Sequence, residues 1–259
     1  MLVAAVDTAT LTLSCALLEV GTGRAELLAE GTEQAPRAAA GVTGGHGARL
    51  PGALTTLLSV HGRRLPDVEG YAVGLGPGSF TGLRIGLATF KGLAYANRRP
   101  IVGVSSLAAM ALAAARQAGT GPGALLVPLL DAKKGEVYAG FYRATGEGVT
   151  ALHPDAALAP AALLSLLASP ELAAGAAGPL EPLGFGEGFL AYEAALAPRL
   201  TQLATEVRTP PASAVGALAA AALRQATFDV PRLSALEPHY VRASEAEVKF
   251  PNGIPAVKP

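Results

Sequence analysis

The chain has 259 residues, which is enough for one large domain or two lobes. Hydrophobic residues make up 51% and charged residues 15%, and this composition excludes an intrinsically disordered protein. Twenty Lys and Arg balance twenty Asp and Glu, which argues against a protein that holds nucleic acid by its overall charge. One cysteine, Cys15, excludes an intramolecular disulfide. No signal peptide or membrane span is expected, because the apolar runs are short or interrupted by charge. We therefore expect a cytoplasmic protein.

The first half of the chain alternates strand and helix patterns, with turn residues between the apolar runs. A helix is expected to begin with Pro51 in its first turn, and Ser105 is expected to cap a later helix. The elements expected in this half are strands at residues 2–6, 11–20, 24–33, 68–75 and 101–104, and helices at about 47–61, 82–97 and 105–117.

The second half begins like the first. With a shift of 124 residues, the segment 2–19 aligns without gaps on 126–143, and Asp7 falls on Asp131. Each copy is an apolar strand, an aspartate, a short turn and a returning strand, which predicts a duplicated α/β lobe. Strands are expected at 125–130 and 136–142, and helices at 161–168 and 213–226.

This duplication is similar to that of the actin, hexokinase and Hsp70-like proteins (the ASKHA, ribonuclease H-like fold), in which two lobes grip phosphates. We therefore expect an α/β two-lobe fold. The first, partner-binding lobe would span residues 1–104 and the second 105–243, with a C-terminal helix returning to the first lobe, and residues 244–259 would form a tail.

The segment GPGSFTG, from Gly76 to Gly82, joins a predicted strand to a predicted helix. It lacks the lysine of a Walker loop and the glycine at position 77 of a nucleophile elbow. Ser79 is therefore interpreted as a cap or turn residue, and anion binding at this helix N-terminus stays open. The residues assigned to this structural loop are Gly76, Pro77, Gly78, Ser79 and Gly82.

The helix expected at 82–97 carries only two charges, Arg84 and Lys91, and apolar residues almost all round. A surface helix of a monomer has one apolar stripe and a broad polar face. Two hypotheses follow: a helix with a second face against a partner, which we prefer, or an internal helix under a covering layer. The preferred interface residues are Leu50, Leu54, Leu57, Leu83, Gly86, Leu87, Phe90 and Leu93.

The segments GPGSFTGLRIG, VSSLAAMA, LLDAKKGEVYAGFY and EPHYVR, in that order, resemble the TsaB (YeaZ) family of bacterial tRNA threonylcarbamoyladenosine (t6A) biosynthesis proteins. The resemblance implies a non-catalytic subunit that binds TsaD, which transfers threonylcarbamoyl to N6 of adenosine 37 in tRNAs reading ANN codons. It further implies that the ATPase TsaE docks on the pair and that tRNA is met only indirectly, through the complex. Helices 47–61 and 82–97 would form the bundle with TsaD, or a homodimer when the chain is alone.

Catalytic residues are not expected. The HxxxH metal pair of the catalytic homologue is missing, since Leu50 follows four residues after His46. Asp7, Thr8 and Asp131 are candidate nucleotide-binding residues, and the competing interpretation is that the aspartates cap turns. No cofactor is expected in the lone chain, although ATP or ADP could bind at the subunit junction of the complex. The alternatives are a nucleotide-dependent kinase or ATPase of this fold, a metal-dependent glycopeptidase-like enzyme, and a homodimeric binding protein unrelated to tRNA.

Overall fold

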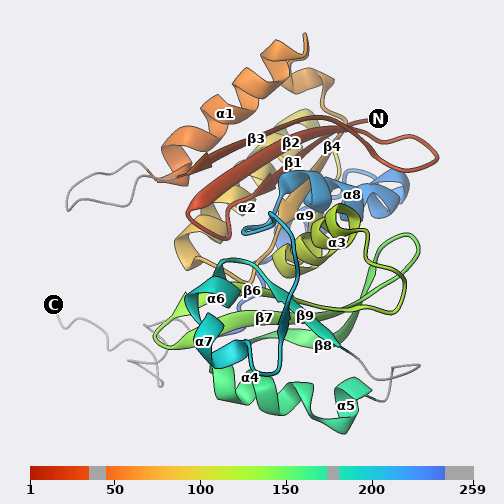
Figure 1. Cartoon of the computed structure of the whole chain (residues 1–259). Coiled ribbons are helices and arrows are strands. Elements are labelled where there is room, and N and C mark those ends of the chain that lie inside the picture. Colours follow the sequence, from red (N-terminus) through yellow and green to blue (C-terminus); the bar gives the residue numbers. More distant parts are fainter. Residues whose placement is uncertain (35–44, 174–180, 243–259) are drawn as a thin grey trace, which may run out of the picture.

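The structure is a computed structural model that describes residues 1–34, 45–173 and 181–242 (Figure 1). The predicted tail, residues 244–259, lies outside them. The strands are β1 Leu2–Asp7, β2 Thr12–Glu19, β3 Glu26–Gln34, β4 Gly70–Gly74, β5 Ile101–Val104, β6 Leu125–Lys133, β7 Glu136–Ala144, β8 Val149–Leu158, β9 Pro182–Phe185 and β10 Thr201–Gln202. The helices are α1 His46–Val60, the 3-10 turn η1 Leu65–Asp67, α2 Phe80–Asn97, α3 Ser106–Ala118, α4 Pro160–Leu167, α5 Pro170–Ala173, α6 Glu187–Ala191, α7 Glu193–Leu196, α8 Ala212–Gln225 and α9 Val230–Ala235.

The two sheets have the same topology. The first has the order β3-β2-β1-β4-β5, and the second, read in the matching direction, is β8-β7-β6-β9-β10. In each lobe the first three strands along the chain form an antiparallel meander. The two later strands of the lobe run parallel to its first strand, β1 or β6. The duplicated two-lobe α/β fold predicted from the repeat is therefore confirmed.

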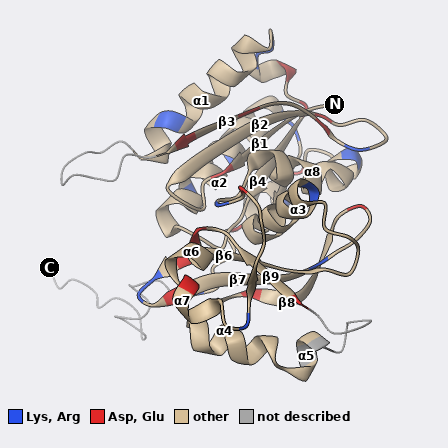
Figure 2. Cartoon of the chain, viewed as in Figure 1, with Lys and Arg blue, Asp and Glu red and all other residues tan. Residues whose placement is uncertain are grey.

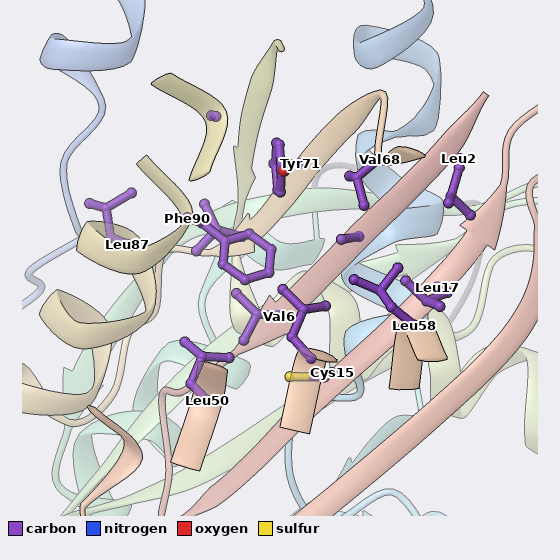
Figure 3. Close-up of a cluster of buried hydrophobic side chains, with 14 of the residues drawn as sticks. Leu2, Val6, Cys15, Leu17, Leu50, Leu58, Val68, Tyr71, Leu87 and Phe90 are labelled. Atoms are coloured by element: carbon purple, nitrogen blue, oxygen red, sulfur yellow. The ribbon is translucent and has the colours of Figure 1, made fainter. Parts of the chain in front are cut away.

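Helices cover both faces of the first sheet because its strands are apolar on both sides. Leu50, Leu54 and Leu58 of α1 and Phe90 of α2 pack on one face of the sheet (Figure 3). On β1 this face carries the alternate residues Leu2, Ala4 and Val6. The opposite face, with Val3, Ala5 and Leu18, packs on α8 and α3. Helix α3 also packs on the second sheet through Leu107, Met110 and Ala114, so it lies between the two sheets (Figure 1).

The end of the chain returns to the first lobe. Helix α8 packs across β1, β2, β4 and β5, and α9 packs on α2. The following segment then spans both lobes: the His239 amide donates to the Leu75 carbonyl, at 2.7 Å, and Arg242 donates to the Ala132 carbonyl, at 3.0 Å, at the β6–β7 turn.

Several local predictions can be compared with the structure. Ser105 caps α3 as predicted, because its Oγ accepts from the Ala108 amide at 3.1 Å. Pro51 lies in the second turn of α1, so its placement in the first turn was wrong. It is tolerated there because Pro51 and Gly47 are both exposed, and the Gly47 carbonyl that loses its helical donor can be solvated. No helix in the described part of the chain is long and apolar enough to cross a membrane.

Candidate functional site

The turn after β1 is built around a buried carboxylate. Asp7 Oδ1 accepts from the Ala9 amide at 2.8 Å, two residues on, and Oδ2 accepts from Ser106 Oγ at 2.6 Å. Burial raises the pKa of Asp7 to about 6, although these hydrogen bonds act in the opposite direction. Asp7 therefore caps its own turn, which is the competing interpretation from the sequence.

The glycine-rich loop closes over this turn. The Ser79 amide donates to the Ala9 carbonyl at 2.7 Å. A Cβ on Gly78 would collide with Ala9, and one on Gly82 with the Thr8 carbonyl. Gly86, one turn into α2, faces the Thr8 side chain in the same way. Because Thr8 is fully buried under α2, a phosphate has no room at the Asp7–Thr8 turn, and these two residues do not fit a nucleotide in this structure.

Ser79 is the N-cap of α2. Its Oγ accepts from the Gly82 amide at 3.2 Å, and its carbonyl accepts from Leu83. This agrees with the interpretation of Ser79 as a cap residue rather than a nucleophile.

Asp131 makes the equivalent turn in the second lobe, in a more open setting. Its Oδ1 accepts from the Lys133 amide at 2.8 Å, and its Oδ2 pairs with Lys133 Nζ at 2.6 Å. Partial burial works to raise the pKa of Asp131, but the hydrogen bonds and charge of Lys133 outweigh it and hold the pKa below its ordinary value. This carboxylate is thus ionised, and its charge is balanced by Lys133 of the same turn.

The sequence also contains a glycine cluster at residues 184–188, GFGEG, which is the candidate in the second lobe for the backbone groove that holds adenosine in nucleotide-binding proteins of this fold. The structure does not show an open groove there. A Cβ on Gly186 would collide with the Leu129 carbonyl, and one on Gly188 would lie 2.7 Å from the carbonyl carbon of Leu130. These glycines let α6 approach β6 closely. Sequence reasoning could not separate this packing role from ligand binding.

The histidines do not form a metal site in the described residues. His46 Nε2 lies 2.7 Å from the Thr10 carbonyl, which ties the start of α1 to the β1–β2 turn. Across residues 1–34, 45–173 and 181–242, no group of three His, Cys, Asp or Glu side chains is arranged to hold a metal.

Sequence reasoning missed a polar cluster where α3 meets the second sheet. Asp155 accepts from Ser105 Oγ and from the Tyr142 hydroxyl, both at 2.6 Å. Burial raises the pKa of Asp155, against the effect of both hydrogen bonds. Since Ser105 already caps α3, this cluster fixes the start of the inter-lobe helix and holds no free nucleophile.

The predicted interface residues need a correction. Leu50, Leu54, Leu87 and Phe90 are buried in the chain's own core, the cluster drawn in Figure 3. Leu83 is also buried. Of the remaining three, Gly86 packs on Thr8, and Leu57 and Leu93 are half-buried against the same core. The internal-helix hypothesis therefore describes the buried side chains of α2, because the sheet, α1 and the C-terminal segment cover more of this helix than one apolar stripe. For the partly exposed Leu57 and Leu93 the interface stays a prediction.

The two helices nevertheless expose unusual faces. The exposed face of α1 carries no charge, and Figure 2 shows this helix uncharged along most of its length. It consists of Gly47, Ala48, Pro51, Gly52, Thr55, Thr56, Ser59 and Val60. The exposed face of α2 consists of Thr81, Ala88, Gly92, Tyr95 and Ala96, with Arg84 and Lys91 along one edge. We call these two sets together the uncharged face.

A solvent-facing helix surface normally carries charges, whereas the centre of a protein interface is depleted of them. Val60 is 75% exposed and Tyr95 is 60% exposed. The corresponding signal in the sequence is the run from Leu50 to Val60, which contains no Asp, Glu, Lys or Arg.

Comparison with known proteins agrees with this architecture. Residues 35–250 match the family model described as TsaD, tRNA N6-adenosine threonylcarbamoyltransferase. The chain is 36% identical over 149 residues to the tRNA threonylcarbamoyladenosine biosynthesis protein TsaB of Escherichia coli K12, which covers 58% of each chain. It thus spans a little over half the length of that curated relative.

Two solved structures from Pseudomonas aeruginosa are also similar. The structure of YeaZ has a TM-score of 0.66 and 30% identity, over 87% of this chain and 94% of that one. An uncharacterised protein similar to peptidase YeaZ has a TM-score of 0.71 and 29% identity, over 93% of this chain and 99% of that one.

Proposed function

The chain belongs to the TsaD family in the broad sense of the matching model, and within it to the TsaB (YeaZ) proteins; on that premise we propose that it is a non-catalytic subunit of the machinery that makes t6A in tRNA. In this proposal it binds TsaD and stabilises the form that transfers threonylcarbamoyl to N6 of adenosine 37 in tRNAs reading ANN codons. TsaE docks on the pair, and ATP or ADP, where it takes part, lies at the subunit junction. The isolated chain pairs with itself through the same surface.

The state of the two aspartate turns supports the non-catalytic role. An enzyme of this fold would use such turns to hold phosphates and a metal ion. Here the Asp7–Thr8 turn is filled by Gly78, Gly82 and Gly86, and the Asp131 carboxylate is paired with Lys133. We therefore derive no nucleotide chemistry from this chain's own residues.

The observation that carries the proposal is the uncharged face of α1 and α2. Leaving two adjacent helix faces without charges is unfavourable for solubility, and it is the composition expected at the centre of a protein interface. Its small residues allow a partner helix backbone to approach closely. Arg84 and Lys91 lie at its edge, where interfaces become polar.

The test compares two alanine variants that add the same charge. Ala88 is exposed on α2, and Ala162 is exposed on α4 of the other lobe. Ala88→Glu should abolish or strongly weaken TsaD binding in calorimetry and lower t6A formation by the reconstituted proteins. Ala162→Glu should leave both unchanged, and both variants should unfold at the temperature of the wild type.

Equal TsaD binding by both variants would show that α2 is not the docking element. Turnover of ATP or of a peptide by the purified chain alone would show instead that it is an enzyme. Elemental analysis of the same purified protein tests the glycopeptidase hypothesis separately, because that hypothesis requires bound metal in stoichiometric amount.

A further inference from the structure

The side of α2 next to the C-terminal segment carries a row of cations without acidic partners. Arg84 and Lys91 are seven residues apart, so they lie on one side of α2 with a rise of about 10 Å between them. Arg98 follows the last residue of α2 as its C-cap, in the left-handed conformation, and its side chain also faces the C-terminal segment. No Asp or Glu occurs anywhere in residues 70–130. In the described part of the chain, none of the three cations forms an ion pair.

Each of these cations is instead held by neutral groups. Arg84 Nε donates to the Tyr240 hydroxyl at 2.9 Å, and its guanidinium lies 3.8 Å from the centre of the Phe80 ring. Lys91 Nζ donates to the Ser234 carbonyl at 3.0 Å. Arg98 lies 5.7 Å from the Phe228 ring. These contacts fix the positions of the side chains without neutralising their charges.

Exposed rings accompany the cations. Phe80 is 39% exposed and Tyr240 is 42% exposed, and the centroids of the two rings lie 5.0 Å apart. The Arg84 guanidinium lies over the Phe80 ring and 5.8 Å from the centre of the Tyr240 ring. We call the set Phe80, Arg84, Lys91, Arg98 and Tyr240 the α2 ridge. Between residues 226 and 242, where the structure describes the C-terminal segment, the acidic residues are Asp229, which pairs with Arg232, and Glu237. The region therefore keeps a positive charge.

We propose that the α2 ridge binds RNA directly, with Arg84, Lys91 and Arg98 on phosphates and Tyr240 and the Arg84 plane under an unpaired base. Unpaired bases in RNA are recognised by stacking on aromatic rings and guanidinium planes, and phosphates supply the affinity. The ligand is the tRNA substrate, so this inference rests on the proposed function. It departs from the expectation that tRNA is met only through the partner, which considered the overall charge and not its distribution.

The position of the ridge fits this role. It runs along the edge of the uncharged face, because Arg84 and Lys91 border both. An RNA strand on the ridge would therefore lie at the boundary between this chain and a partner docked on that face. The other occupant that the charges allow is an acidic protein surface, and the experiment separates the two.

The experiment measures, by fluorescence anisotropy, the binding of an unmodified tRNA transcript to the full chain, alone and with TsaD. The salt concentration is varied between about 50 and 200 mM. The test variant is the triple substitution Arg84→Gln, Lys91→Gln and Arg98→Gln. The control is Arg24→Gln, Arg63→Gln and Arg199→Gln, which removes the same charge from exposed positions elsewhere. Single-strand contacts give a salt slope of about −0.7 per phosphate, so the test variant should lose about two units of slope and at least about tenfold in affinity at low salt. The control should change neither by as much.

A second variant tests stacking. Tyr240→Ala should weaken RNA binding while leaving the salt slope unchanged, because stacking releases no counterions. The inference is overturned if the wild type binds no tRNA at low salt, or if the control loses as much as the test variant. It is also overturned if the test variant loses TsaD but keeps tRNA, since the ridge would then bind an acidic protein surface. Failure of the proposed function looks different: TsaD would not bind the wild-type chain at all.

Discussion

Two glycines of α2, six residues apart, should respond to substitution in opposite ways. Gly92 is exposed, and a Cβ added there would have no atom within 4 Å. Gly86 is buried, and a Cβ added there would collide with the Thr8 side chain. Both occupy the interior of one helix, so the backbone contribution to the free energy of unfolding is the same at the two positions.

In the isolated chain Gly92→Ala should be stabilising by about 0.8–1 kcal/mol, which is the helix-propensity difference. The unfolding temperature should rise by about 2–4 °C for a chain of this size. Gly86→Ala gains the same propensity but overpacks the Thr8 turn, which costs about 1–3 kcal/mol. Its unfolding temperature should therefore stay the same or fall.

Gly92→Gln separates folding from partner binding. Glutamine is a good helix former, so the isolated chain should be at least as stable as the wild type. A long side chain in the middle of the uncharged face holds a partner helix away, and an overpacking cost of about 1–3 kcal/mol corresponds to roughly five- to 150-fold weaker TsaD binding.

The assays are differential scanning calorimetry for stability and isothermal titration calorimetry with TsaD for binding. Wild-type affinity of Gly92→Gln would refute the assignment of this helix face to the partner. A loss of stability in Gly92→Ala would refute the exposure of Gly92 itself, and with it the orientation of α2.

Three further predictions concern buried groups. Burial raises the pKa of Asp7 from 3.8 to about 6, so the folded protein binds this proton more tightly than the unfolded chain, and stability falls as pH rises through that range. Relative to Asp7→Asn, urea unfolding of the wild type should show a loss of about 2 kcal/mol between pH 4 and pH 7; parallel pH profiles would contradict this. Phe90→Ala, which removes a buried ring packed edge-to-face on Tyr71 at 5.6 Å, should cost about 3–5 kcal/mol in the same measurement; a loss below about 1 kcal/mol would place the ring at the surface. Burial raises the pKa of the Cys15 thiol to about 12, so a thiol reagent at pH 8 should label it only in denaturant, and rapid labelling of the native protein would show that this core opens.

The repeat was the most informative feature of the sequence. It predicted the hairpins β1–β2 and β6–β7 and placed Asp7 and Asp131 at equivalent turns, and the pairing of these strands confirms this. It succeeded because each copy combines an apolar alternation with a residue type that caps turns locally. The cap residues Ser79 and Ser105 could be predicted for the same reason, since a cap depends on a few neighbouring residues.

The strands β8, β9 and β10 could not be predicted. β8 is the edge strand of the second sheet and includes Pro154 and the charged Asp155, which weaken the strand pattern. β9 has four residues and begins with proline, and β10 has two. β9 pairs with β6, about fifty residues earlier in the chain, and β10 pairs only with β9, so no local window contains the signal for these two strands.

The interface residues were misassigned for a related reason. Counting apolar residues around α2 could not show that three different elements, the first sheet, α1 and the C-terminal segment, cover it. Leu233 of α9 joins the same core cluster as Phe90 and Leu50, although it is more than 130 residues away in sequence. Once the covered sides of α2 are known, the absence of charge on its remaining face identifies the surface that we assign to a partner.

Helix α2 therefore has to satisfy three different requirements on three sides. Gly82 and Gly86 fill the space above the Asp7 turn, Ala88 and Gly92 leave an uncharged face open, and Arg84 lies on the cationic side held by the C-terminal segment. Substitutions on one side should leave the functions of the others intact when the sides are independent, because distant sites contribute additively. A double variant such as Gly92→Gln with Arg84→Gln should then combine the loss of partner binding with the loss of RNA binding and show no further loss of stability. Strong coupling between the two in the thermal unfolding of the isolated chain would mean that the C-terminal segment, and not α2 alone, determines how both surfaces are presented.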